Sequence, residues 1–237
     1  MDRYVLNEQE LKRRIMGARE IALEIARCDA FLNSKEECKK ILAFQDRQGK
    51  RQLPEPWNGN IETAKYLFIS SNPSYDINEE WPKLDSDDED VYAFFVNRFN
   101  KKTYEDIKRV SYWRIINKWV HWLNNIYQNN YDFNLINKAK KELMLDQVCL
   151  TEVVHCKSKG EIGVKECAKV CVKKHLKKVI SLFKGSCIIV VGKLANQYIE
   201  YIKDCSNCIV VYMAHPNAHG IKDVSRFDSF IGKLKKQ

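Results

Sequence analysis

Polar side chains follow short apolar runs in this sequence, and their residue types are ones that could do chemistry. Asn72 and Pro73 come two serines after the run 66–69, and His215 and Pro216 follow a later apolar run. An asparagine fixed by a proline can position a water or a polar ligand, but it cannot act as a strong base. Asn-Pro after a strand is also a common way to begin a turn, so this motif alone leaves a structural role open.

The elements that must position these residues alternate along the chain. Four apolar runs of strand length, at 64–71, 146–156, 186–192 and 208–216, are separated by segments with helical spacing, at 7–47, 104–127, 163–183, 193–203 and 225–236. This alternation predicts an α/β fold, a single three-layer α/β/α domain over 1–237 with a central, mainly parallel four-stranded sheet. Ligands bind outside the carboxyl ends of the strands in such sheets, so we expect Asn72, Glu152 and His215 to share one crevice.

Length, hydropathy and charge restrict the class of protein. The 237 residues are 45% hydrophobic, which is enough for one core. No run approaches the roughly eighteen apolar residues of a membrane span. The N-terminus lacks an apolar signal segment, so we expect a cytoplasmic protein. The net charge of +9 fits a nucleic-acid partner, and it equally fits a solvated, lysine-rich surface.

Nine cysteines require an explanation in a chain of this kind. In a reducing cytosol, clustered cysteines indicate a metal site or buried apolar side chains more often than disulfides. The segment 205–219 has two cysteines followed by two histidines, like part of a zinc finger. However, six residues separate the two pairs, where about twelve are usual. Cys149 and Cys187 lie inside predicted strands and are most simply core residues.

Four local patterns together resemble the uracil-DNA glycosylase superfamily, over roughly residues 28–230. "SSNPS" is similar to the Gly-x-Asn-Pro-Gly motif of the mismatch-specific and single-strand-selective branches. "LTEVVHC" resembles the Thr-Asn-Val-Val-Lys-Cys strand of the iron–sulfur branch, which also keeps a cluster ligand where this chain has Cys171. "AHPN" is similar to the His-Pro-Ser motif. Ser70 and Ser74 depart from the pattern, since the family has glycines there.

The resemblance implies hydrolysis of an N-glycosidic bond in DNA by a positioned water. Asn72 then matches the residue that holds the water, and His215 matches the residue that stabilises negative charge on the departing base. The base must be flipped out of the stack to be reached. Further residues are expected to line the base pocket (Ser70, Ser71, Pro73, Ser74, Tyr75, Glu152 and Phe95) or to contact DNA (Lys157, Lys159, Pro216, Asn217, Ala218 and His219).

Glu152 stands where the iron–sulfur branch has an asparagine, and this departure bears on the substrate. An ionised carboxylate should repel O4 of uracil and accept a hydrogen bond from a cytosine amine, whereas a protonated carboxyl could pair with cytosine through N3 as well. The most uracil-restricted branch of the family has a bulky tyrosine after the proline, and Ser74 at this position leaves room for a 5-substituent. We therefore expect a damaged or modified base such as a 5-substituted cytosine, with uracil as the alternative. An ion pair between Glu152 and Lys157 or Lys159 is the purely structural interpretation.

The iron–sulfur branch also implies a metal centre, to which the helical region 1–50 would contribute cysteines. Its layout implies a [4Fe-4S] cluster held by Cys28, Cys38, Cys156 and Cys171. Nine residues separate the first two cysteines, where the branch has a tight Cys-x-x-Cys, so an intervening turn is needed. Cys167 is an alternative ligand because it lies four residues before Cys171 on the same predicted helix face. Zinc is the alternative metal.

The sequence therefore predicts a monomeric, monofunctional DNA glycosylase that leaves an abasic site and carries a structural cluster. The alternative is a non-catalytic, metal-stapled nucleic-acid-binding protein on the same fold. The glycines missing from the first motif favour this second interpretation.

Overall fold

The structure is a computed structural model, and it describes residues 8–98, 111–127 and 143–216. The expected helix at 225–236, part of the one at 104–127, and the candidate DNA contacts Asn217, Ala218 and His219 lie outside these residues. Among the described helices, none is both long and apolar enough to cross a bilayer.

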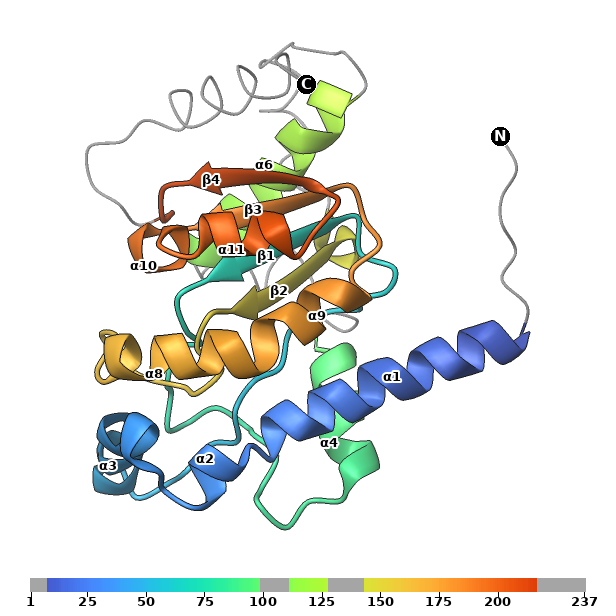
Figure 1. The fold of residues 1–237 in the computed structure, drawn as a ribbon. Coiled ribbons are helices and arrows are strands. Elements are labelled where there is room, and N and C mark those ends of the chain that lie inside the picture. Colours follow the sequence, from blue (N-terminus) through green and yellow to red (C-terminus); the bar gives the residue numbers. More distant parts are fainter. Residues whose placement is uncertain (1–7, 99–110, 128–142, 217–237) are drawn as a thin grey trace.

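Four parallel strands form the centre of the molecule (Figure 1). They are β1 (Tyr66–Ser70), β2 (Val148–Glu152), β3 (Cys187–Val191) and β4 (Ile209–Met213), in the spatial order β2-β1-β3-β4. Every residue of the first three strands is buried, as expected for near-continuous apolar runs in a parallel sheet that is covered on both faces. The predicted single-domain α/β fold with a parallel four-stranded sheet is confirmed.

Helices cover both faces of the sheet, which makes the three layers. On one face, Leu67, Ile69, Ile188 and Val190 belong to a core shared with most of the helices. These are α1 (Glu8–Ala26), α2 (Asp29–Leu32), α3 (Lys39–Arg47), α4 (Asp88–Val96), α8 (Val164–Cys171), α9 (Lys177–Leu182), α10 (Lys193–Asn196) and α11 (Ile199–Asp204).

The opposite face of the sheet packs against α6 (Ser111–Tyr127). Phe68 of β1 stacks on Trp119 of α6, with ring centroids 6.4 Å apart. Ile116, Val120 and Leu123 of the same helix are also fully buried in this second core. The expected amphipathic helix with an aromatic face is therefore present over the described part of 104–127.

Two expected helices are interrupted. The helical pattern at 7–47 is broken after Ala26, and α2 and a 3₁₀ turn (Glu36–Cys38) intervene before α3. These breaks supply the turn that the separation of Cys28 and Cys38 requires. The predicted helix at 163–183 is divided by a π-helical turn, η4 (Val172–Leu176), between α8 and α9. π-Helical turns are rare in proteins, but those that do occur are often found at functional sites.

The strand order places β1 at the topological switch point. The chain passes from β1 to β2 on one side of β1, and then crosses back to β3 on its other side. Ligands of open α/β sheets bind at such a point, outside the carboxyl ends of the strands. Asn72, two residues beyond the end of β1, lies directly at this position.

Candidate active site and thiol pocket

The Ser-Ser-Asn-Pro segment is held by the chain that continues beyond β2. The amide of Val153 donates to the Ser70 carbonyl at 2.9 Å, and the amide of Val154 donates to the Ser71 carbonyl at 3.0 Å. Further on, the amide of Ser158 donates to the Pro73 carbonyl at 3.1 Å. The loop after β1 is therefore an ordered extension of the sheet and not a free turn.

The side-chain amide of Asn72 is fixed in orientation. Its Nδ2 donates to the carbonyl oxygens of Pro73, at 2.9 Å, and Ser158, at 3.2 Å. Its Oδ1 receives only a long contact of 3.4 Å from the Ser71 hydroxyl. Because both amide protons are used by the backbone, the oxygen is the part of this half-buried side chain that can still hold a water. This arrangement suits the positioning role that the sequence predicts.

His215 reaches the same edge of the sheet from β4. β3 ends at Gly192, whose φ of 88° favours glycine, and the Gly192 amide donates to the Met213 carbonyl at 3.0 Å. A Cβ at Gly192 would come within 3.6 Å of the His215 Cβ, so the two residues are neighbours. With β3 between β1 and β4, Asn72 and His215 flank a gap of roughly two strand spacings, about 10 Å.

Tyr112 of α6 is a candidate that the sequence analysis missed. Its ring lies 5.7 Å from the His215 ring. Its hydroxyl is buried and has no hydrogen-bonding partner among the described residues. Burial raises the pKa of this hydroxyl; a negative charge on Glu152 would raise it further, and the nearby Ser70 side chain opposes the shift. Tyr112 belongs to no motif, and only the packing of α6 brings it to the strand ends.

Glu152 ends β2 beside Ser70 of β1, and it is 1% exposed. Its Oε2 has no hydrogen-bonding partner among the described residues. Burial, and then the nearby charge of Glu55, raise the pKa of Glu152 well above its ordinary range, although Lys157 and Arg98 oppose this shift. Burial therefore favours the neutral form of this carboxyl group. The alternative, structural interpretation is wrong, because Glu152 forms no ion pair with Lys157 or Lys159.

Glu55 comes from a segment that covers the free edge of β2. Asn58 and Leu150 exchange backbone hydrogen bonds of 2.7 and 2.9 Å, and the Thr151 hydroxyl donates to the Pro56 carbonyl at 2.7 Å. One carboxylate oxygen of Glu55 accepts a hydrogen bond from the Asn58 amide. This segment carries no motif, and its position beside the site depends on tertiary pairing.

Lys157 was expected to contact DNA, and the structure contradicts this. Its side chain is 2% exposed and its ammonium lies 2.5 Å from Glu79 Oε2 and 3.9 Å from Glu55 Oε2. The same ammonium lies 3.5 Å from the centroid of the Trp81 ring. A lysine enclosed in this way cannot reach a phosphate. Lys159, by contrast, is exposed as expected.

Two residues that were expected to line the base pocket, Tyr75 and Phe95, pack in the protein core instead. The Tyr75 hydroxyl donates to the Lys50 carbonyl at 2.7 Å, and its ring packs edge-on against Phe44. Phe95 is fully buried and packs edge-on against Trp81 at 5.5 Å. Both are core residues, so neither is available to stack on a base. Ser74 is exposed, as expected of a position that leaves room.

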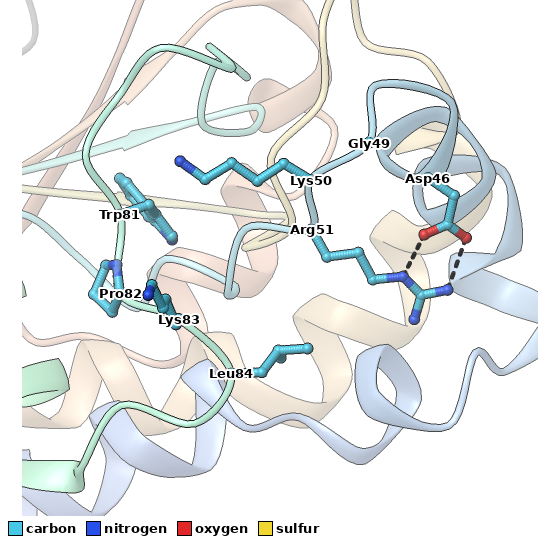
Figure 2. A pocket seen from close by; sticks show the side chains of 8 residues that line it. All are labelled: Asp46, Gly49, Lys50, Arg51, Trp81, Pro82, Lys83 and Leu84. Atoms are coloured by element: carbon cyan, nitrogen blue, oxygen red, sulfur yellow. Dashed lines mark hydrogen bonds and ion pairs between the residues drawn. The ribbon is translucent and has the colours of Figure 1, made fainter.

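A surface hollow of about 520 Å³ lies beside the loop that follows Asn72 (Figure 2). It is lined by Asp46, Gly49, Lys50, Arg51, Trp81, Pro82, Lys83 and Leu84, and we call it the basic hollow. Arg51 turns toward Asp46 and binds it through two contacts of 2.5 and 2.7 Å. Lys50 extends toward Trp81, and its ammonium donates to the Glu79 carbonyl at 3.0 Å. The residues that line the basic hollow carry three cations (Lys50, Arg51 and Lys83) and one carboxylate (Asp46), so their net charge is positive.

The cysteines expected to bind a metal converge on one small cavity of about 20 Å³. This thiol pocket is lined by Cys28, Cys38, Cys156, Cys167 and Cys171, together with His155 and His175. The sulfurs of Cys38 and Cys167 are 3.4 Å apart. Cys28 lies at 3.4 Å from both His175 Nε2 and Lys174 Nζ. The structure thus brings together the four expected ligands and the alternative, Cys167.

His155 is a further potential ligand that the sequence analysis missed. Its Nδ1 donates to the Glu55 carbonyl at 2.8 Å, and its Nε2 has no partner among the described residues. Burial lowers the pKa of His155 to about 4, so the ring is neutral. A neutral imidazole oriented by a hydrogen bond from its other nitrogen is the form that binds metals.

The thiol and imidazole groups of the thiol pocket suit a metal that prefers sulfur ligands, although the side chains as placed do not surround an ion. Among the described residues, no three or more His, Cys, Asp or Glu side chains form a group that could hold an ion as placed. Hydrogen bonds that the Cys156 thiol donates to Cys167 and Cys38, and then burial, raise the pKa of Cys156, so this thiol keeps its proton. Soft sulfur ligands favour zinc or an iron–sulfur cluster, and binding would displace the thiol protons. Four thiolates around one zinc stand about 3.8 Å apart, close to the 3.4 Å between Cys38 and Cys167.

The other cysteines lie in the cores or, for Cys205 and Cys208, pack against one of them while half-buried. Cys149 and Cys187 are fully buried inside strands, as expected. Cys208 donates to the Gly185 carbonyl at 3.3 Å.

Comparison of the chain with protein-family models and with curated proteins finds no match.

Proposed function

We propose that this protein is a monofunctional DNA glycosylase that removes a flipped-out pyrimidine, either uracil or a modified cytosine, and leaves an abasic site. The observation that carries this proposal is the strand-end constellation. Asn72, with its oriented amide, and His215 flank the topological switch point, and Glu152, at the end of the adjacent strand β2, buries an oxygen that has no partner among the described residues.

In this mechanism a water attacks C1′ of the nucleotide. The Asn72 oxygen accepts a hydrogen bond from that water and orients it. The C1′–N bond breaks with its electron pair on the base, and a C1′–O bond forms with the water. His215 donates a hydrogen bond to the departing base and so stabilises its negative charge. The proton released by the water passes to solvent, and the products are the free base and an abasic sugar.

The DNA backbone would run over the positive surface beside the crevice. The Asn-Pro loop and the basic hollow are joined by the hydrogen bond from Tyr75 to the Lys50 carbonyl. Lys50, Lys83 and Lys159 replace Lys157 as the proposed phosphate contacts, because Lys157 is buried. Pro216, which was also expected to contact DNA, is buried and is not proposed as a contact.

The thiol pocket would hold a structural metal centre, either a [4Fe-4S] cluster or zinc. Cys38, Cys156 and Cys167 would bind it together with Cys171 or Cys28. The metal would supply folding energy and take no part in the hydrolysis. Absorbance near 400 nm, roughly where thiolate-bound clusters absorb, distinguishes the two metals, and elemental analysis then identifies zinc.

Base release tests the activity directly. Purified protein is incubated with oligonucleotides that carry uracil or a 5-substituted cytosine, and abasic sites are detected by strand cleavage after alkali. We expect alkali-labile sites with the parent protein, and at least a hundredfold slower formation with Asn72→Ala or His215→Ala. Asn78→Ala, an exposed asparagine beyond the same loop, is the matched control. A mobility shift without alkali-labile sites would instead support the non-catalytic nucleic-acid-binding protein.

A further inference from the structure

Two buried carboxyl groups lie close together at the base-facing end of β2, and their surroundings differ. Glu55 has partners that suit an anion, because the Asn58 amide donates to one oxygen and the Lys157 ammonium lies 3.9 Å from the other. Glu152 has an oxygen without any such partner among the described residues. Burying a charge without a partner is far more costly than burying a neutral group.

The cations near Glu152 are already engaged. Lys157 Nζ lies 2.5 Å from Glu79 Oε2, and Arg98 binds the other oxygen of Glu79. The remaining groups that face Glu152 are Glu55, from the segment before β1, and the Tyr112 hydroxyl, from α6. Cys149, on the same strand, is a buried thiol. None of these groups compensates a negative charge on Glu152.

We propose that Glu152 is a protonated carboxylic acid in the working protein and reads the base as an asparagine amide would, with one donor and one acceptor. This inference rests on the proposed function. A protonated carboxyl presents one O–H donor and one carbonyl acceptor, whereas a carboxylate presents acceptors only. The oxygen that lacks a partner among the described residues, on the residue paired with Ser70, is available to contact a ligand.

This assignment defines the substrate class. Uracil offers N3–H and O4 along one edge, and cytosine offers N3 and an exocyclic amine. A neutral carboxyl can pair with either edge, because its proton and its carbonyl match one acceptor and one donor in each case. Glutamate in place of asparagine therefore does not reject uracil, contrary to the expectation for an ionised side chain. Recognition of either base would then depend on the proton of the Glu152 carboxyl group.

The pH dependence of base release tests the assignment. Single-turnover rates are measured from pH 6 to pH 10 for the parent protein, Glu152→Gln and Glu55→Gln. The parent rate should fall about tenfold per pH unit above the pKa of Glu152, whereas the rate of Glu152→Gln, whatever its value at pH 7, should lack this decline. Glu55→Gln removes the neighbouring charge, so its decline should begin at lower pH. A parent rate that does not fall over this range, or a Glu152→Gln rate that falls as steeply as the parent rate, would overturn the proposal.

A measurement without DNA separates this inference from the proposed function. The infrared difference spectrum between the parent protein and Glu152→Gln at pH 7 should contain the carbonyl band of one protonated carboxyl group. Absence of that band in folded protein would overturn the proton assignment. Presence of the band, with no release from any substrate, would overturn the glycosylase proposal and with it the reading of a base.

Discussion

Single residues at the strand ends differ in whether their polar groups have partners. Both amide protons of Asn72 are used by backbone carbonyls, so its orientation is determined before any ligand arrives. Glu152 and Tyr112, in contrast, each bury an oxygen that has no partner in the described part of the chain. Such groups destabilise the folded protein, and they are retained where a ligand can satisfy them.

Replacing Tyr112 by phenylalanine should therefore separate stability from activity. Removal of an unpartnered buried hydroxyl should leave the free energy of unfolding unchanged or raise it by about 1 kcal/mol. Base release should slow, because the neighbour of His215 and Glu152 loses its polar group. Urea unfolding and single-turnover release measure the two effects. A clear decrease in the free energy of unfolding would show that the hydroxyl has a structural partner, and Tyr198→Phe on the opposite face is the control.

Lys157 and Lys159 are two positions apart, but their replacement by alanine should have different effects. The first change should lower stability, and the second should weaken oligonucleotide binding. Lys157→Ala leaves Glu55 and Glu79 without their shared ammonium, and removing one partner of a buried ion pair costs about 3–5 kcal/mol. Lys159→Ala should hardly change the free energy of unfolding, because this lysine is exposed, and it should weaken binding of oligonucleotides. Equal stability of the two variants in urea would contradict the burial of Lys157.

At the scale of elements, the site depends on how loops are attached to strands. The segment after β2 hydrogen-bonds the loop after β1, and Gly192 at the end of β3 sets the approach of His215. On the other side of the sheet, the start of α8 is packed against α3. A Cβ at Gly163 would lie 2.8 Å from the Lys40 Cβ and 2.9 Å from the Ile41 amide nitrogen. The thiol pocket is lined by residues of α8 and by Cys38, the last residue of the 3₁₀ turn that precedes α3.

Two glycines before α8 allow a matched test of this packing. Gly160 and Gly163 both have positive φ, of 61° and 74°, but a Cβ at Gly160 would meet nothing within 4 Å. Gly160→Ala should cost only the backbone strain, about 1–2 kcal/mol. Gly163→Ala should cost more and should lower the metal content, because α8 carries Cys167 and Cys171. Equal metal content and melting temperature in the two variants would contradict the contact between α3 and α8.

For the whole molecule, the fold was predictable because its signals are local and repeated. Four apolar runs separated by helical segments suffice for a parallel sheet, and strand ends with polar residues suffice to locate Asn72 and His215. Glu55, Tyr112 and the burial of Lys157 could not be predicted, since they depend on segments that meet only in three dimensions. The grouping of five cysteines was partly predictable, whereas the proximity of Cys38 to Cys167 depends on how α3 packs against α8.

The charge of the molecule should act mainly through one edge of the sheet. If the basic hollow binds phosphates, Lys83→Ala combined with Lys159→Ala should weaken binding of oligonucleotides. It should also reduce the slope of log affinity against log salt by about 0.7–0.9 for each phosphate that the double variant no longer neutralises. Fluorescence anisotropy over a range of salt concentrations measures both quantities. Lys184→Ala, a change in an exposed lysine that precedes β3 at the opposite edge, should leave the slope unchanged; a similar reduction for both would show that the effect is not local.

Residues 152–158 combine three roles on one short piece of chain. Cys156 lines the thiol pocket and the carbonyl of Ser158 holds the amide of Asn72, while Glu152 would face the base in the proposed function. An insertion or deletion here would displace all three at once, so descendants of this protein can change the segment only by exchanging side chains. Lineages that diverge in substrate should therefore differ by point substitutions at positions such as 152, while their length variation accumulates in other loops.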